Sequence, residues 1–395
     1  MARYLILIFA SLLLILGCTQ EETAGDKTST NTEPLVTFLA AANEPTRGKA
    51  MSGDLDVTSN FRVYATKQRR EGDHPYPNAL EEVWVNGDVV SYQSIELNPQ
   101  YHVWVWKTDA DYHWPQDMYF VNFYAVHPES APVISDILTS KVVNYDGTTH
   151  YITGDDDLML AKIEKTRRYD SNYTSVTDLL GDNCTVNLTF HHLLSQIMFY
   201  GRLSNLFDSY GWTVEVGGIT IHNVNSAATA QFTTTGFSIT PASTSVPRDY
   251  TLAMNANRQP ITTTNVAKDN DGKDIPLTSP TDVTMLVPQT LTAWVPASIS
   301  GGTTIASNPS SNSYLEIAIR IKDRNNLYVM GTADSYHTIY APFSTSWQTA
   351  KRHNYYLTFG GGYDAEGNSV LQTLSIEAAI TPWESEEVNA IVKRN

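Results

Sequence analysis

The side chains that could support catalysis or metal binding are few, and their surroundings disfavour both roles. His191 and His192 are adjacent within the alternating segment 186–199. Neighbouring side chains of a strand point to opposite faces of a sheet, so the two imidazoles could not readily share one metal ion. We expect one of them to be a hydrogen-bonded structural histidine. Asp155-Asp156-Asp157 and Asp269-Asn270-Asp271-Gly272 could hold a cation, but the second lacks the glutamate that ends a calcium loop. Both are better explained as solvated acidic turns.

The sequence contains no local motif of a common enzyme class. A G-x-S-x-G elbow, an H-E-x-x-H zinc helix, a P-loop and a G-x-G-x-x-G turn are all missing. We therefore expect no catalytic residue, no metal and no cofactor. Two carboxylates are enough for a glycosidase, so a lipid-anchored hydrolase stays open as a minor hypothesis. The formal net charge of -16 argues against binding nucleic acid or anionic lipid through a basic face.

Cys18 is the residue with the clearest predicted chemistry. A positive start at Arg3 precedes an apolar run over residues 5–16, and Gly17 then precedes the cysteine. The run is roughly a dozen residues, short of the ~20 that span a bilayer, so residues 1–17 are predicted to be a secretory signal peptide. Ile15-Leu16-Gly17-Cys18 resembles the bacterial lipobox, which implies that the Cys18 thiol is lipidated and that the new amino terminus is acylated. Several acyl chains anchor a protein stably to a membrane.

The segment 18–33 is polar and is predicted to be a flexible tether. Its acidic start, Glu21-Glu22, resembles the surface-export signal of Bacteroidales lipoproteins, which implies an outer-membrane, surface-exposed location. The alternative is an ordinary signal with a chance cysteine, which would leave a free thiol in an oxidising compartment. Only Cys184 remains besides Cys18, so a lipidated chain has no intramolecular disulfide and depends on its core.

Alternation of apolar and polar residues with period two dominates the chain, while helical periodicity is scarce. Strands are predicted over residues 101–106, 118–126, 314–321 and 353–359. Asn86-Gly87, inside the β-rich segment 83–90, predicts a tight hairpin turn. Many short strands indicate an all-β fold, and 395 residues fit two sandwich domains, 34–180 and 183–395.

A set of loose motifs follows in order along most of the mature chain. They are Pro45-Thr46-Arg47-Gly48, Trp114-Pro115, Asp157-Leu158-Met159-Leu160-Ala161, Phe190-His191-His192-Leu193-Leu194-Ser195-Gln196-Ile197, Leu286-Val287-Pro288-Gln289, Lys351-Arg352-His353-Asn354-Tyr355-Tyr356 and Trp383. The ordered set resembles the fimbrillin family of Bacteroidales.

This resemblance implies a type V fimbrial pilin with two tandem transthyretin-like β-sandwich domains. It also implies a lipid-anchored precursor whose N-terminal strand, 34–47, is removed by an arginine-specific protease cutting between Arg47 and Gly48. Arg69-Arg70 and Arg167-Arg168 are alternative cutting sites. Losing a strand would expose unpaired backbone groups and an apolar groove, which a strand of another fimbrial subunit could fill.

The predicted donor is the C-terminal region, where Leu374, Ile376, Ala378 and Ile380 alternate with polar or small residues. The same residues could instead form an ordinary strand of the second domain, which leaves the tail 384–395 as another donor candidate. Stalk, tip and anchor roles all remain open, as does a host or bacterial surface ligand. The main alternative is a surface glycan-binding lipoprotein that does not polymerise, with Trp104, Trp106 and Trp114 as its exposed sugar-binding side chains.

Overall fold

The computed structural model describes the strand-forming part of the chain. The described residues are 35–42, 53–54, 58–98, 101–115, 119–131, 134, 136–146, 157–166, 173–174, 185–243, 247–257, 259–262, 276–371 and 374–382. Within them regular structure is almost entirely β, with a short α-helix, α3 (Asn205–Ser209), and a 3-10 turn, η1 (Ile305–Ser307). The predicted all-β class is confirmed. Among these residues no helix has the length and apolarity to cross a membrane.

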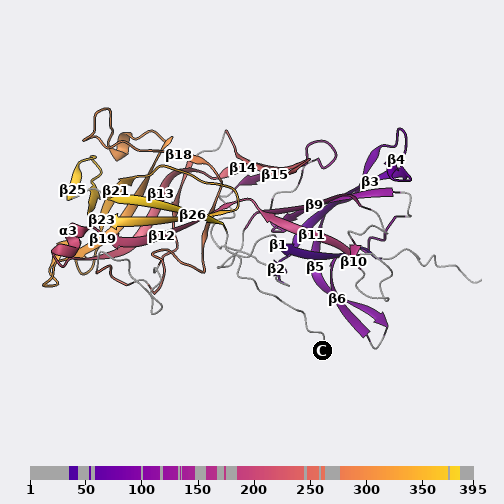
Figure 1. The fold of residues 1–395 in the computed structure, drawn as a ribbon, viewed down its shortest axis with the longest axis horizontal. Helices are drawn as coiled ribbons and strands as arrows, with labels where there is room; N and C mark the ends of the chain where they lie inside the picture. Colours follow the sequence, from indigo (N-terminus) through magenta and orange to yellow (C-terminus); the bar gives the residue numbers. More distant parts are fainter. Residues whose placement is uncertain are drawn as a thin grey trace, which may run out of the picture. The chain divides into compact units, whose positions relative to one another are not determined.

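The first sheet has ten strands and closes on itself. Its strands are β1 (Thr37–Ala42), β2 (Gly53–Asp54), β3 (Phe61–Glu71), β4 (His74–Pro75), β5 (Glu81–Asn98), β6 (Tyr101–Thr108), β7 (Tyr119–His127), β9 (Met159–Thr166), β10 (Tyr173–Thr174) and β11 (Thr185–His192). The order is β10-β11-β9-β7-β3-β5-β6-β1-β2, and β1 also pairs with β11. Because β1 is bonded to both β6 and β11, it closes a ring of strands around an aromatic core. Figure 1 shows β1 beside β11.

Two further sheets pack face to face in the second half. One has the order β17-β12-β23-β26, and the other has the order β16-β13-β19-β21-β24-β25 with β18, β20 and β22 attached. Alternating side chains build the core between them; β19, for example, buries Leu315, Ile317, Ile319 and Ile321. The bounds are β12 (Ser195–Leu203), β13 (Thr213–Asn225), β16 (Pro247–Thr251), β17 (Thr284–Leu286), β18 (Thr290–Ala293), β19 (Asn312–Lys322), β20 (Tyr328–Met330), β21 (His337–Pro342), β22 (Thr345–Ser346), β23 (Lys351–Phe359), β24 (Gly361–Tyr363), β25 (Ser369–Leu371) and β26 (Ser375–Pro382).

A three-stranded sheet joins segments that are distant in the sequence. β8 (Val142–Asp146) pairs with β14 (Ala227–Thr233), and β14 also pairs with β15 (Gly236–Pro241). A third apolar cluster, including Tyr124, Leu193 and Phe232, packs around this sheet. Residues Pro34–Asn395 accordingly form one compact unit.

The hydrogen bonding places the change of sheet later than the predicted boundary at 180–183. β11 follows that boundary, yet it pairs with β1, β9 and β10 of the first sheet. The segment 186–199 is not one strand either, because the chain leaves the first sheet at Leu193 and Leu194 and enters β12 at Ser195. The alternation of residues 186–190 breaks at this crossover, where Leu193 and Leu194 are adjacent apolar residues followed by Ser195 and Gln196.

Asn86-Gly87 does not form the predicted hairpin turn. β5 runs through both residues and stays paired with β3, with a register shift between Val63 and Tyr64 that leaves Gly87 as a bulge. Gly87 has φ +83°, and a Cβ there would lie 2.9 Å from the Tyr64 ring. A bulge and a type I′ turn both require positive φ, so the dipeptide alone does not separate them. The strands predicted at 101–106, 118–126, 314–321 and 353–359 correspond to β6, β7, β19 and β23.

Candidate strand-exchange site

The first strand, β1, is enclosed by hydrogen-bonded neighbours. All six of its residues pair in parallel with Thr185–Phe190 of β11, and Phe38 pairs with Trp106 of β6 on the other side. β2 continues the pairing at Ala41 and Ala42. If β1 were removed, β6 and β11 would each lose a hydrogen-bonding neighbour.

The inward side chains of β1 supply part of the ring's core. Phe38 and Ala40 are each 4% exposed and Val36, directly before β1, is 3% exposed, while Leu39 points outward and is 47% exposed. The Phe38 ring packs edge-on against Phe123, with centroids 5.8 Å apart, and against Phe61. Removing the strand would therefore uncover a groove whose floor consists of aromatic rings, in line with the apolar groove expected on loss of this strand.

Polar contacts fix the register of β1. The hydroxyl groups of Thr37 and Thr185 lie 2.9 Å apart, fully buried, between β1 and β11. The Val36 N–H donates to the Tyr112 carbonyl at 2.8 Å. The Tyr112 hydroxyl in turn donates to Asp88 Oδ2 at 2.5 Å, and this hydrogen bond, assisted by burial, raises the pKa of Tyr112 to about 12. β1 is held by contacts from three parts of the ring.

Several predicted sites lie outside the described residues. These are Cys18, Arg47, Gly48, the calcium-like turn 269–272, Trp383 and the tail 384–395. Lipidation of Cys18 and cleavage between Arg47 and Gly48 therefore stay predictions. β1 ends at Ala42, five residues before the predicted cut after Arg47.

The last described strand, β26, contains the other half of the predicted exchange. It pairs along Ser375–Pro382 with β23, and among the described strands it stands at the end of its sheet. Leu374, Ile376, Ala378 and Ile380 recur at every second position, and Leu374 and Ile376 pack against the second core. In this chain the donor candidates thus occupy the ordinary-strand position that was the alternative interpretation, and their transfer to another subunit stays a prediction.

An open groove borders the inner face of β26. It has a volume of about 340 Å³ and is lined by Pro342, Phe343, Ser344, Tyr355, Tyr363, Leu374, Ile376 and Ala378. Tyr355 lies deep within it, and burial raises the pKa of its hydroxyl to about 12. Ala378 is exposed and Ile380 is 48% exposed, so β26 is only partly covered on the side that faces the core.

The adjacent histidines separate as expected. His192 is buried, and its Nδ1 lies 2.5 Å from Asp157 Oδ2, whereas the His191 ring packs against Phe237 with centroids 4.9 Å apart. The prediction of a structural histidine is confirmed for His192. The expectation that Asp157 belongs to a solvated turn is wrong, because its carboxylate is 1% exposed and pairs with His192.

The three tryptophans proposed for sugar binding differ in exposure. Trp104 is 59% exposed and stacks on Tyr92 with centroids 5.5 Å apart. Trp106 and Trp114 are 6% and 1% exposed, so the expectation that they are surface groups is wrong. Trp106 faces inward beside β1, and Trp114 packs against Phe123. Alternation predicts that a side chain faces one side of a sheet but not which side is covered.

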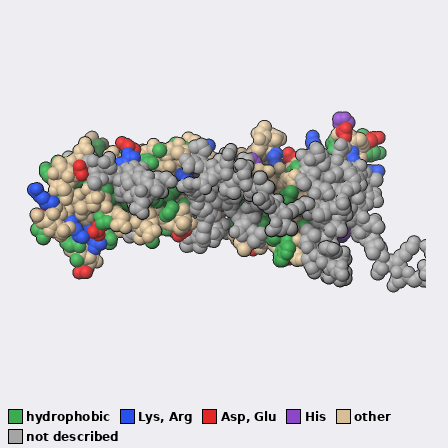
Figure 2. All heavy atoms as spheres, turned by 60° about the horizontal axis from the view of Figure 1, so that its bottom comes forward, with side chains coloured by type: hydrophobic (Ala, Val, Ile, Leu, Met, Phe, Trp, Pro, Cys, Tyr) green, Lys and Arg blue, Asp and Glu red, His purple; other side chains and the backbone are tan. Residues whose placement is uncertain are grey.

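The described part of the chain holds no group of three or more His, Cys, Asp or Glu side chains arranged to bind a metal ion. On the face drawn in Figure 2, the Lys and Arg side chains that are described lie interspersed with Asp and Glu rather than in a basic stripe. The closure of the ring by β1 and β6 could not be predicted from the sequence, since pairing between distant strands leaves no local signal.

Comparison with known proteins gives a family. The profile described as fimbrillin-like matches residues 48–383. Among solved structures, a fimbrial protein from Bacteroides vulgatus is similar over 88% of this chain and 99% of its own, with 15% identity and a TM-score of 0.44. The tip fimbrial protein Mfa3 from Porphyromonas gingivalis is similar over 89% and 100%, with 11% identity and a TM-score of 0.31. No curated protein matches. Because the profile covers most of its length, the chain belongs to the fimbrillin-like family.

Proposed function

We propose that this protein is a non-enzymatic, adhesive structural subunit of surface fimbriae, assembled by exchange of strands between subunits. In this proposal the precursor is a surface lipoprotein of the outer membrane, anchored through Cys18. An arginine-specific protease cuts after Arg47 and releases the segment that contains β1. The partners are other fimbrial subunits, with a host or bacterial surface as the adhesion target.

The position of β1 is the observation that carries the proposal. β1 is the first described strand, it lies between β6 and β11, and it contributes Phe38 to the core. A protease that cuts after Arg47 would separate β1 from the rest of the chain without breaking any other described strand. The vacated groove has two unpaired edges and an apolar floor, and these features favour occupation by another β-strand.

The donor in this proposal is the segment that forms β26. Its alternating residues Leu374, Ile376, Ala378 and Ile380 match the alternation that β1 presents to the core. Among the described strands β26 has a hydrogen-bonded neighbour on one side, so moving it breaks one of the described ladders rather than two. The tail 384–395 is the second donor candidate.

The first test is digestion of the purified full-length protein with an arginine-specific protease. We expect one new amino terminus at Gly48 and ladders that resist sodium dodecyl sulfate, visible as polymers by native mass measurement and electron microscopy. The matched control is Arg47→Lys, which keeps the charge but removes the arginine that the protease reads. A cut elsewhere, such as after Arg69 or Arg70, or a cut at Arg47 that leaves monomers, would count against a stalk subunit.

The donor assignment is tested on exposed positions, so that folding of the monomer is kept. Ala378→Asp and Ile380→Asp place a charge on the face that would enter the groove, and we expect cut monomers that do not polymerise. Glu377→Gln, on the opposite face, is the control and should polymerise normally. Polymers that form with both aspartate variants would move the donor to 384–395.

A second candidate function is glycan binding, which the exposed Trp104 supports. Its ring stacks on Tyr92 and leaves an aromatic surface open to solvent. Trp104→Ala should then abolish retention on immobilised glycans while leaving polymerisation intact. Retention that survives this substitution would remove Trp104 from the candidates.

A further inference from the structure

The first and last described strands carry the same order of side chains. With the residue before each strand, the two segments read Val36-Thr37-Phe38-Leu39-Ala40-Ala41-Ala42 and Leu374-Ser375-Ile376-Glu377-Ala378-Ala379-Ile380. Position by position, both have an apolar residue, a hydroxyl residue, a large apolar residue, an exposed residue and then alanine. The segment that occupies the groove and the segment that would refill it are therefore alike beyond simple alternation.

The groove requires the hydroxyl residue of this pattern. Thr37 and Thr185 are both fully buried, and their hydroxyl oxygens lie 2.9 Å apart. The next residues on the same face, Leu39 and Asn187, are exposed, so the requirement is confined to the place of Thr37, the hydroxyl position. A strand that replaces β1 buries Thr185 again, and a residue without a polar group beside it would leave a buried hydroxyl unpaired.

The alanine of the pattern sets a limit on size. Ala40 is 4% exposed, belongs to the aromatic core of the ring and lies opposite Leu188 of β11. A well-packed core does not accept extra methylene groups without strain. The place of Ala40 is therefore a small position. The place of Phe38, whose ring packs against Phe61 and Phe123, is a large position.

One register of the β26 segment meets all of these conditions. With Ser375 at the hydroxyl position, Ile376 takes the large position and Ala378 takes the small one. A shift by two residues in one direction brings the carboxylate of Glu377 to the buried hydroxyl position, and the opposite shift brings Ile376 to the small position. A shift by one residue turns every side chain to the wrong face.

Entry of β26 in the reverse direction fails at the backbone. Thr381 could then take the hydroxyl position, but Pro382 would take the place of Val36. The Val36 N–H donates to the Tyr112 carbonyl at 2.8 Å, and proline has no N–H to donate. The donor must therefore run in the same direction as β1.

The tail 384–395 fits the groove less well than β26 does. Its one alanine, Ala390, would have to take the small position. Charged residues then fall at the hydroxyl position and at the place of Val36, in one chain direction Glu387 and Glu386, and in the other Lys393 and Arg394. Charges at two buried places disfavour the tail as the donor.

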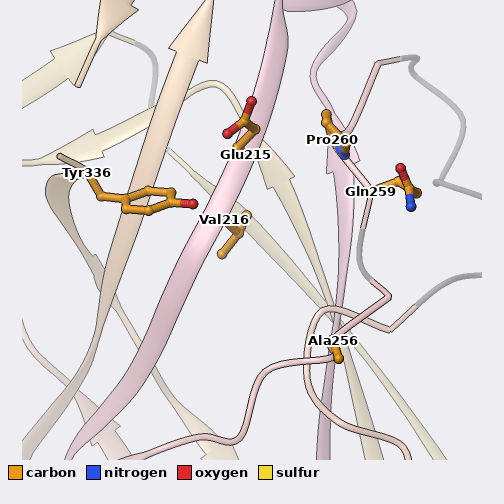
Figure 3. Close-up of a pocket in the computed structure, with 6 residues that line it drawn as sticks. All are labelled: Glu215, Val216, Ala256, Gln259, Pro260 and Tyr336. Carbon is orange, nitrogen blue, oxygen red and sulfur yellow. The ribbon is translucent and has the colours of Figure 1, made fainter. Parts of the chain in front are cut away.

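The polar pocket beside β13 does not suit the donor either. Glu215 and Tyr336 contribute to its lining, and Glu215 accepts from Arg320 at 2.6 Å and from Lys322 at 3.0 Å. Figure 3 shows Tyr336 directed toward β13 beside Glu215, and Gln259 directed away from both. Such a wall offers no row of apolar sites at the two-residue spacing of a strand.

We propose that the β26 segment of one copy fills the groove left by β1 in a second copy of this chain, with Ser375 beside Thr185. This register rests on the proposed function, since it presupposes cleavage and exchange of strands. It makes the chain complementary to itself, so that one kind of subunit can form a stalk. The exposed place of Leu39, opposite Asn187, then falls to Glu377, and both residues of this pair face solvent.

The register is tested by disulfide trapping at this exposed pair. Full-length protein with Asn187→Cys, Glu377→Cys and Cys184→Ser is cut with an arginine-specific protease and mildly oxidised once polymers have formed. We expect a disulfide between position 187 of one subunit and position 377 of the next, found by mass spectrometry and as ladders that only a reductant dissolves. Ser375→Cys or Ala379→Cys in place of Glu377→Cys is the matched control. Either should crosslink at least about tenfold less, because two residues, about 7 Å along a strand, take the thiols out of reach.

A second measurement tests the hydroxyl position. Ser375 is exposed in the monomer, so Ser375→Ala leaves the fold of the monomer unchanged. Its polymers should dissociate at least about tenfold faster in denaturant than those of the unchanged protein, because Thr185 is left unpaired. Ser375→Thr, which keeps a hydroxyl group, should dissociate as slowly as the unchanged protein.

The outcomes separate the register from the exchange of strands. Monomers that persist after a cut at Arg47 would overturn both. Polymers that crosslink through position 375 or 379, or through none of the three positions, would overturn the register alone. Polymers of Ser375→Ala that are as stable as those of the unchanged protein would do the same.

Discussion

The first and last described strands differ in how firmly they are built into their sheets. β1 has bonded neighbours on both sides and buries Phe38 and Ala40. β26 is paired with β23 alone among the described strands, and it leaves Ile380 48% exposed. Two strands with the same alternating pattern are therefore expected to contribute very different amounts to the free energy of unfolding.

This difference bears on how strands could be exchanged. A strand enclosed on both sides opens rarely, because two ladders and a core side chain must be lost together. Cutting the chain makes such an opening irreversible. An edge strand with a half-covered face opens at lower cost and is the easier one to move. The proposed maturation therefore needs a protease for β1 but not for β26.

The largest expected effect comes from Phe38→Ala in β1. Truncating this buried ring removes contacts with Phe61 and Phe123 and leaves a cavity, so we expect a loss of about 3–5 kcal/mol in the free energy of unfolding. Urea denaturation measures it. Leu39→Ala, on the exposed face of the same strand, is the control and should cost less than about 0.5 kcal/mol. Similar losses for the two variants would mean that β1 is not seated in the ring.

Hydrogen exchange compares the two strands directly in the unchanged protein. The amides of β1 that pair with β11 should open only with the whole ring, whereas those of β26 should open locally. We expect an opening free energy at least about 2 kcal/mol higher for β1, or roughly a 30-fold slower exchange. Equal protection of β1 and β26 against hydrogen exchange would contradict the difference in how firmly the two strands are bound in their sheets.

Acid should weaken both regions through buried histidines. Burial lowers the pKa of His127, in the ring, and that of His353, which pairs with Ile380 of β26. The Gln348 N–H donates to His353 Nε2 at 3.1 Å, a bond that requires the neutral ring. Because these pKa values lie below 6.5, the unfolded chain binds protons first as the pH falls through 6.5.

Stability should consequently fall by up to about 1.4 kcal/mol per pH unit for each such histidine below pH 6.5. Denaturation midpoints at pH 7.5 and 5.5 measure this loss. His127 faces the Asp157 backbone, with Glu129 and His192 nearby. The part of the stability loss that comes from His127 therefore also depends on those groups. His353→Gln should reduce the loss of stability in acid and restore the hydrogen-exchange protection of β26 without changing that of β1. If the pH dependence of stability is unchanged in this variant, His353 is not its cause.

The strands were predictable where alternation is local, and the contacts between strands were not. β6, β7, β19 and β23 follow from period-two patterning, as does the shared face of Leu374 and Ile376. The pairing of β1 with β11 joins residues about 148 positions apart, as between Thr37 and Thr185, and depends on the packing of the whole ring.

The smallest expected effect is that of Ile380→Ala in β26. The side chain is 48% exposed, so truncation removes little buried area and leaves no closed cavity. We expect a loss below about 0.5 kcal/mol in the free energy of unfolding of the monomer. Ile376→Ala is the control. Ile376 packs against the core, so its truncation should lower the free energy of unfolding by more. In the proposed polymer the same substitution should lower stability, because Ile380 in the groove left by β1 would be buried between two strands. Polymers of the Ile380→Ala variant should thus dissociate more readily while the monomer is unaffected, and a destabilised monomer would show that β26 is as firmly seated as β1.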